Sequence, residues 1–180
     1  MKKREVAIWD MASHILENVS KGVLVTTKAG EKVNSMTISW GTLGIEWGKP
    51  IFTTFVREHR FTRELLEESM EFTVNIPYGD FDKKILGVCG SKSGRDIDKV
   101  KELGLTPVES EIVGAPGLKE LPLTLECKVI YKTLQNKAAI LEDIKSECYP
   151  QDVDSFSPRA NKDFHITFCG EIVKAYIIEE

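Results

Sequence analysis

The chain has 180 residues, of which 42% are hydrophobic and 29% charged, and its formal net charge at pH 7 is −4. These values are typical of one soluble globular domain, large enough to fold without a metal ion or a disulfide. The acidic balance argues against nucleic acid or an anionic membrane as the main partner, and no apolar run approaches the ~18 residues of a membrane span.

The first twenty residues begin basic and then mix charged with apolar positions. A secretory signal needs an unbroken apolar stretch there, so we expect a cytoplasmic protein. Apolar residues at helical spacing predict a helix over residues 5–19, and we therefore expect residues 1–20 to be a helical extension of a single domain spanning residues 1–180.

Six stretches carry the alternation, β-branched residues and flanking turn signals of strands. The first two are expected to form an antiparallel hairpin around Gly30. The six predicted strands cover residues 22–27, 33–40, 50–56, 71–76, 123–135 and 165–180.

Helices are expected mainly in the middle of the chain. Thr62 can cap a short helix, residues 81–90 form a second, and residues 93–105 form a third that begins with Ser93 and Asp96 in a capping-box arrangement. The segments outside these elements are loops at 106–122 and 150–163, and a stretch at 138–149 that is ambiguous between strand and helix. Strands clustered at both ends favour a mainly β protein, an antiparallel barrel with helical additions, over a doubly wound parallel sheet.

Residues 34–40, NSMTISW, place three small hydroxyl residues on one face of a strand and mostly apolar residues on the other. The apolar face can pack into the core. The hydroxyl face is either an ordinary polar surface or the wall of a site for a ligand rich in hydrogen-bonding groups, such as a flavin.

Cations and hydroxyls surround the two predicted helix starts near residues 62 and 93. A helix start offers free N–H groups and a positive dipole end, which suit a phosphate monoester, although caps and solvated arginines are also common without any ligand. The sequence GVCGSKSGR does not have the glycine spacing of a nucleotide-hydrolase phosphate loop. The cysteines Cys89, Cys127, Cys148 and Cys169 form no C-x-x-C pair, so we expect no metal site and reduced, mostly buried thiols.

Four segments, NSMTISW, REHRFTRELLEESMEFTVNIP, CGSKSGRDIDKV and HITFCGEIV, occur in an order that resembles the flavin reductase-like proteins of the FMN-binding split-barrel superfamily, which includes flavoredoxin. The resemblance runs from about residue 21 to the C-terminus. It implies a six-stranded antiparallel Greek-key split β-barrel, a homodimer, and one non-covalently bound FMN per subunit.

Carried over residue by residue, the resemblance implies three groups of cofactor-binding residues and one residue on the nicotinamide side. The ring and ribityl chain would be lined by Asn34, Ser35, Met36, Thr37, Ser39 and Trp40; the phosphate end would be held by Arg57, His59, Arg60 and Thr62; a second loop would supply Ser91, Lys92, Ser93 and Arg95; and His165 would face a nicotinamide.

This chain departs from many relatives before the final strand, where Phe164 separates Asp163 from His165, and at the REH segment. The first departure bears on nicotinamide binding more than on FMN binding. The resemblance implies an FMN-containing oxidoreductase, an NAD(P)H-dependent flavin reductase or a flavoredoxin-like electron carrier, serving a redox partner protein or a flavin-dependent monooxygenase. The alternatives are an FMN-binding carrier or storage module without nicotinamide-dependent activity, and a flavin-free barrel. Because the redox chemistry would belong to the cofactor, no catalytic side chain is expected.

Overall fold

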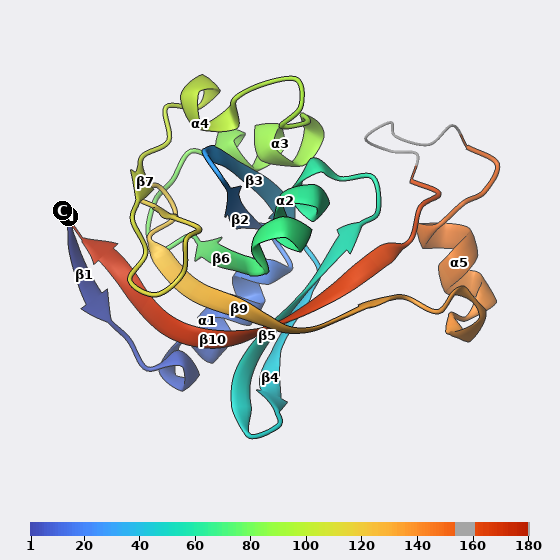
Figure 1. Cartoon of the computed structure of the whole chain (residues 1–180), viewed down its shortest axis with the longest axis horizontal. Coiled ribbons are helices and arrows are strands. Elements are labelled where there is room, and N and C mark those ends of the chain that lie inside the picture. Colours follow the sequence, from blue (N-terminus) through green and yellow to red (C-terminus); the bar gives the residue numbers. More distant parts are fainter. Residues whose placement is uncertain (154–160, 180) are drawn as a thin grey trace.

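The structure is a computed structural model that describes residues 1–153 and 161–179. Eight strands form one antiparallel sheet that curves around a hydrophobic core (Figure 1). The order across the sheet is β3-β2-β6-β9-β10-β5-β4, and β1 pairs with the far end of β10. The strands are β1 (Lys2–Glu5), β2 (Val23–Ala29), β3 (Lys32–Ile38), β4 (Gly41–Glu46), β5 (Lys49–Arg57), β6 (Glu71–Ile76), β9 (Leu123–Leu134) and β10 (His165–Glu179).

The six predicted strands are all present, as β2, β3, β5, β6, β9 and β10, and the mainly β fold class is confirmed. The remaining pair, β7 (Pro107–Val108) and β8 (Gly117–Leu118), forms a small separate ladder within the predicted loop 106–122. Residues 154–160 of the predicted loop 150–163 lie outside the described residues.

The helices lie on two sides of the sheet. In Figure 1, α3 (Lys84–Ser91) and α4 (Lys99–Glu102) lie above the β2–β3 hairpin and α2 (Phe61–Ser69) lies beside it. The helix α1 (Ala12–Val19), which follows the 3₁₀ turn η1 (Ile8–Met11), is seen behind β9 and β10. The long strands β9 and β10 extend to an arm that carries the 3₁₀ turn η2 (Lys137–Ala139) and α5 (Glu142–Cys148). The ambiguous stretch 138–149 is therefore mainly helical.

The core is built from the inward-facing positions of the long strands. Its largest fully buried side chains include Phe52, Phe72, Phe168 and Leu125, each from a different strand. Burying one such side chain contributes roughly 1.5–3 kcal/mol, so these positions dominate the stability of the sheet. A smaller cluster, which includes Leu24, packs beneath α3.

Two parts of the sheet were not predicted. The chain begins with β1, which pairs with β10, so the helix starts later than expected and Trp9 and Leu16 are about half exposed. Strand β4 was missed altogether: it forms a tight hairpin with β5 around Trp47 and Gly48, both of which have positive φ angles, as a two-residue hairpin turn requires.

Both predicted helix caps are wrong. Arg60, not Thr62, is the N-cap of α2, and Thr62 lies inside the first turn. Residues 93–98 form a turn stabilised by the Ser93 backbone and side chain, and the short helix α4 begins only after Asp98, whose carboxylate accepts a hydrogen bond from the Lys101 N–H group. Thr62 therefore bonds to the side chain of Asn34 in β3 instead of capping α2, and Ser93 stabilises the turn that precedes α4 instead of the helix itself.

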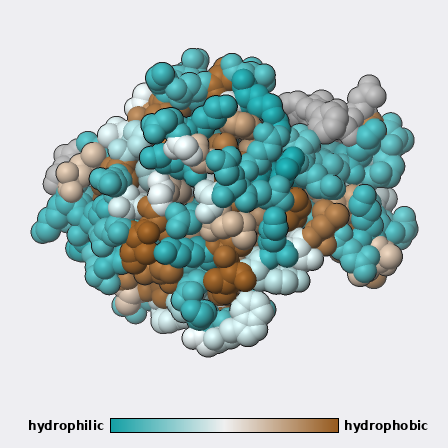
Figure 2. All heavy atoms as spheres, in the orientation of Figure 1, coloured by the Kyte–Doolittle hydropathy of each residue, from teal (hydrophilic) through white to brown (hydrophobic). Residues whose placement is uncertain are grey.

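The face shown in Figure 2 is mostly hydrophilic, with apolar side chains gathered below its centre. Within the described part of the chain, no helix is long and apolar enough to cross a membrane.

A glycine is required at position 170 in β10 because the Phe72 side chain packs closely against the backbone there. A Cβ atom at this position would lie 2.6 Å from two ring atoms of Phe72 and 3.0 Å from the Cβ atom of Cys127. Gly44 in β4 is the matched control, since a Cβ atom there would meet nothing within 4 Å.

We predict that Gly170→Ala lowers the free energy of unfolding by roughly 1–3 kcal/mol, the usual cost of an overpacked core. Gly44→Ala should change it by less than about 0.5 kcal/mol. Urea unfolding followed by circular dichroism measures both values. Equal stabilities for the two variants would show that the barrel accommodates the added methyl group and that this contact does not constrain the fold.

Candidate functional site

Two adjoining hollows open beside β3. The larger has a volume of about 500 Å³ and lies between the N-terminal half of β3, the start of α2 and the segment from Cys89 to Lys99. The smaller, of about 160 Å³, lies between the C-terminal end of β3, β5 and the start of β10. They share Met36 and Arg60 in their walls, so a ligand can extend from one into the other.

The predicted site residues come together around these hollows, except Ser35. Those lining the larger hollow are Asn34, Met36, His59, Arg60, Thr62, Ser91, Lys92, Ser93 and Arg95. Those lining the smaller one are Met36, Thr37, Ser39, Trp40, Arg57, Arg60 and His165.

Strand β3 uses its hydroxyl groups differently from the prediction. The Ser35 side chain is fully buried and bonds to the Thr26 hydroxyl of the neighbouring strand at 2.8 Å. Thr37 donates to the carbonyl oxygen of Leu86 in α3 at 2.7 Å. These hydrogen bonds connect β3 to β2 and to α3, and Ser35 offers no side-chain group to either hollow. The opposite face is only partly as predicted: Met36 and Ile38 pack in the core, whereas Trp40 is 45% exposed and lines the smaller hollow.

The larger hollow is rich in cations. Arg60, Lys92, Arg95 and Lys99 line it, whereas Asp96 is its one carboxylate among the described residues. Arg95 is partly neutralised, because its guanidinium pairs with Glu64 and donates to the carbonyl oxygen of His59. The Arg60 guanidinium donates no hydrogen bond within the part of the chain that the structure describes, and burial lowers its pKa. The wall therefore carries positive charge that few neighbouring carboxylates offset.

Lys99 is the site residue that sequence reasoning missed. It lies at the start of α4, only 5% exposed, and its ammonium donates to the carbonyl oxygens of Ser35 and Cys89 at 2.9 and 3.0 Å. Burial, with a smaller effect from the positive charge of Arg60, lowers its pKa to about 8. The sequence signal was its place at the end of SGRDIDK, within a segment that carries the family resemblance, but no role was assigned to it.

Close packing fixes the floor of the larger hollow. The Asn34 side-chain amide donates to the Thr62 hydroxyl at 2.8 Å, and both side chains are buried. Gly94 passes directly over them: a Cβ atom there would lie 2.1 Å from the Asn34 Oδ1 atom and 2.8 Å from the Phe61 ring. A glycine lets the backbone of this loop approach the strand closely, so the loop itself forms one wall.

His165 is held as a neutral imidazole in the smaller hollow. The Tyr149 hydroxyl donates to Gln135 and therefore accepts from the Nδ1–H group of His165, at 2.8 Å. Burial, reinforced by the positive charge of Arg57, lowers the pKa of His165 to about 3. The Trp40 ring lies 5.2 Å from the imidazole, centroid to centroid. At neutral pH the other ring nitrogen, Nε2, is thus an acceptor.

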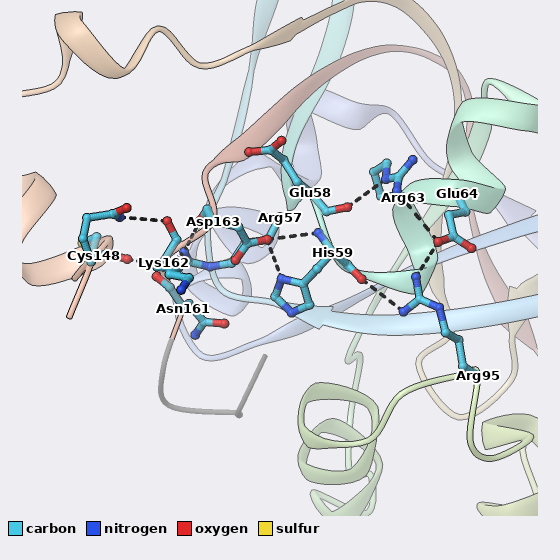
Figure 3. A network of polar contacts seen from close by, with 11 residues as sticks. Arg57, Glu58, His59, Arg63, Glu64, Arg95, Cys148, Asn161, Lys162 and Asp163 are labelled. Atoms are coloured by element: carbon cyan, nitrogen blue, oxygen red, sulfur yellow. Dashed lines mark hydrogen bonds and ion pairs between the residues drawn. The ribbon is translucent and has the colours of Figure 1, made fainter. Parts of the chain in front are cut away.

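Arg57 and His59 hold the arm between β9 and β10 against the site (Figure 3). Arg57 donates to the carbonyl oxygens of Cys148, Asn161 and Asp163, at 2.9, 3.1 and 2.7 Å respectively. The Asp163 carboxylate accepts from the His59 backbone N–H group and contacts its ring. Much of the hydrogen-bonding capacity of the REH segment is therefore used on the protein's own backbone.

The thiols do not gather into a redox or metal centre. Cys89, Cys127 and Cys169 are buried, Cys148 is partly buried, and all four are free thiols, as the spacing predicted. The described residues contain no cluster of three or more histidine, cysteine, aspartate or glutamate side chains able to hold a metal ion.

Residues 17–180 match the profile of the flavin reductase like domain, and the chain belongs to that family. An uncharacterized protein of Archaeoglobus fulgidus is 33% identical over 100 residues, which are 56% of this chain and 55% of that protein. The match thus spans little more than half the length of that curated relative.

Two solved structures share the fold. A flavoredoxin from Methanosarcina acetivorans is 25% identical, with a TM-score of 0.65 over 88% of this chain and 68% of the other. An FMN-binding domain of a flavin reductases-like enzyme from Shewanella baltica is 20% identical, with a TM-score of 0.66 over 98% and 77% of the two chains. The fold is therefore the split barrel that the sequence resemblance implied.

Proposed function

We propose that the protein binds FMN non-covalently across the two hollows and acts as an oxidoreductase that passes electrons through it. The observation that carries the proposal is the cation-rich wall of the larger hollow, with the buried ammonium of Lys99, beside a smaller hollow lined by Trp40 and hydroxyl groups. A phosphate monoester suits the first and a flavin ring suits the second. The names of the structural neighbours, a flavoredoxin and an FMN-binding domain, support this assignment.

The residues present fit the cofactor. The volume of the larger hollow, about 500 Å³, is within the usual range for a ligand site. Arg60, Lys92 and Ser93 would hold the phosphate by charge and hydrogen bonds. Met36, Ser39 and Trp40 would line the ring. When bound, FMN supplies the redox chemistry, and the protein supplies position, electrostatics and access.

NAD(P)H is the proposed electron donor, reaching the flavin from the side of His165. The neutral imidazole offers an acceptor at its Nε2 atom, and Trp40 offers an aromatic face beside it. The proposed recipient of the electrons is a redox partner protein or a flavin-dependent monooxygenase.

The rival function is an FMN-binding carrier or storage module without nicotinamide-dependent activity. One observation favours it: His165 is only 5% exposed and is hydrogen-bonded to Tyr149, so little of its ring is available to a co-substrate. Flavin binding is common to both functions and does not distinguish them.

We further propose a homodimer. Apolar side chains lie exposed at three places: Trp40 beside the smaller hollow, Ile45, Trp47 and Tyr131 on the β4–β5 hairpin and β9, and Leu141 and Ile144 on the arm. They are between 45% and 71% exposed. The Trp47 and Tyr131 rings contact each other across two strands. A second subunit seated there would bury this surface and cover a flavin in the smaller hollow.

If the dimer forms, light scattering at micromolar concentration should give twice the chain mass of 20.3 kDa. Replacing Trp47 and Ile45 by Ser should shift the equilibrium toward the monomer, because the replaced side chains supply apolar area to the interface. A monomeric wild-type protein would contradict the proposal.

Charge variants test the phosphate assignment. Arg60→Gln and Lys92→Gln should each weaken FMN binding about 10- to 100-fold, since a charge-assisted hydrogen bond contributes roughly 1.5–3 kcal/mol. Riboflavin, which lacks the phosphate, should bind these variants as well as it binds the wild type. Lys101→Gln is the control, because the Lys101 side chain is 86% exposed and outside both hollows. Equal losses of affinity for FMN and riboflavin, measured by fluorescence titration, would show that the phosphate does not bind in this hollow.

Anaerobic mixing separates the two functions. With FMN bound, a reductase should lose its visible flavin absorbance within seconds to minutes after NADH or NADPH is added. The carrier should keep its absorbance with both nucleotides and lose it only with dithionite. The rate constant from stopped-flow absorbance, measured with each nucleotide, decides between them.

A further inference from the structure

Lys99 is a buried charge without a counter-ion among the residues that the structure describes. The chain folds its side chain inward from α4, beneath the loop 91–98, until the ammonium reaches two carbonyl oxygens, one on β3 and one on α3. An ammonium has three N–H donors, so one remains after these two bonds. No described carboxylate forms an ion pair with it, and its side chain lines the larger hollow.

The described elements packed around Lys99 supply no compensating negative charge. Strand β3 contributes carbonyl and amide groups but no ionisable side chain near it. Helix α3 contributes the Cys89 thiol, whose pKa burial raises to about 11, so that it stays neutral at pH 7–9. The start of α2 contributes another cation, Arg60.

The loop adds charges of both signs, all more exposed than Lys99. Lys92 and Arg95 are cations, and Arg95 is paired with Glu64. Asp96 lines the hollow on its exposed side, and the Asp98 carboxylate is paired with the Lys101 ammonium. His59 contacts Asp163. No described carboxylate offsets the Lys99 charge directly, and a buried charge without a partner is costly.

We propose that Lys99 couples anion binding to proton binding: a phosphate monoester in the larger hollow supplies the missing counter-ion, so that at alkaline pH its binding takes up a proton on Lys99. This inference rests on the proposed function for its ligand, and it adds a pH dependence that the function does not require. Lys99 is a binding residue in this account and takes no part in electron transfer.

The direction of the effect follows from linkage. The free protein loses the Lys99 proton around pH 8, where burial and Arg60 have lowered its pKa. A dianion beside the ammonium raises that pKa again, so the complex keeps the proton to higher pH. Affinity is therefore full below pH 8 and falls as the pH rises above it, by about tenfold between pH 7 and pH 9.

Isothermal titration of FMN into flavin-depleted protein measures this coupling at pH 7, 8 and 9. The FMN phosphate is a dianion over this range, because its second pKa is near 6. Two buffers with different ionisation enthalpies give the number of protons taken up, which should approach one per FMN at pH 9. Riboflavin should show neither the loss of affinity nor the proton uptake.

A pair of variants assigns the coupling to its residue. Lys99→Met keeps an unbranched side chain, one atom shorter, and removes the charge. It should bind FMN more weakly at pH 7 and with an affinity that no longer changes between pH 7 and 9. Lys92→Met removes an exposed cation from the same hollow and should weaken binding while keeping the wild-type pH dependence. Thermal unfolding checks that each variant is folded.

The results that would overturn the inference are plain. One is proton uptake near zero when FMN binds to the wild-type protein at pH 9. The other is a wild-type pH dependence of the FMN affinity that persists in folded Lys99→Met. If neither flavin binds, the proposed function fails, and inorganic phosphate becomes the probe. Phosphate binding with the same proton uptake would then preserve the inference, and no phosphate binding would end it.

Discussion

The candidate site depends on how the free edge of β3 is covered. A strand at the edge of a sheet presents unpaired backbone groups, and proteins usually cover or block them. Here α3 and α4 close over β3 by polar contacts from both sides: the Lys99 ammonium reaches the Ser35 carbonyl oxygen, and the Thr37 hydroxyl reaches the Leu86 carbonyl oxygen. The same closure leaves the two hollows on either side of Met36 and brings a buried cation into one of them.

The two hollows differ in chemistry, and the difference gives the site a direction. The larger is positive, since Arg60, Lys92 and Lys99 face it with few opposing carboxylates. The smaller is bordered by the Trp40 ring and a neutral His165. A ligand with an anionic end and a flat ring would therefore bind in one orientation. The arm that carries Asp163 contributes by holding the REH segment in place through Arg57 and His59.

Much of the barrel could be predicted because its long strands alternate regularly and end at turn residues. β6, for instance, has the bounds that its alternation and Pro77 indicated. The failures have local causes. β4 contains two glycines and no buried residue, so it lacks the buried face that marks a typical strand in the sequence. The capping errors arose because Thr62 and Ser93 bond to tertiary or turn neighbours that spacing does not reveal.

The family resemblance identified most residues of the candidate site. It did not indicate which of them are buried or hydrogen-bonded within the protein. Sequence order placed Asn34 and Arg60 in one site, and the structure brings them to one hollow. Nothing in the sequence distinguished Ser35, whose hydroxyl is used inside the sheet, from Ser39, which faces the smaller hollow. Nor did it show that Lys99 is buried and Lys101 exposed, because burial at one turn of a short helix is decided by the loop folded above it.

The central claim is that the two hollows form a single flavin site. Backbone amide NMR spectra recorded during a titration with FMN test it most directly. The account predicts that the largest shift changes occur at Met36 and Arg60, which border both hollows, and extend to Ser93 on one side and Trp40 on the other. Lys101, outside both hollows, should change little. Changes confined to one hollow, or centred away from β3, would contradict the account.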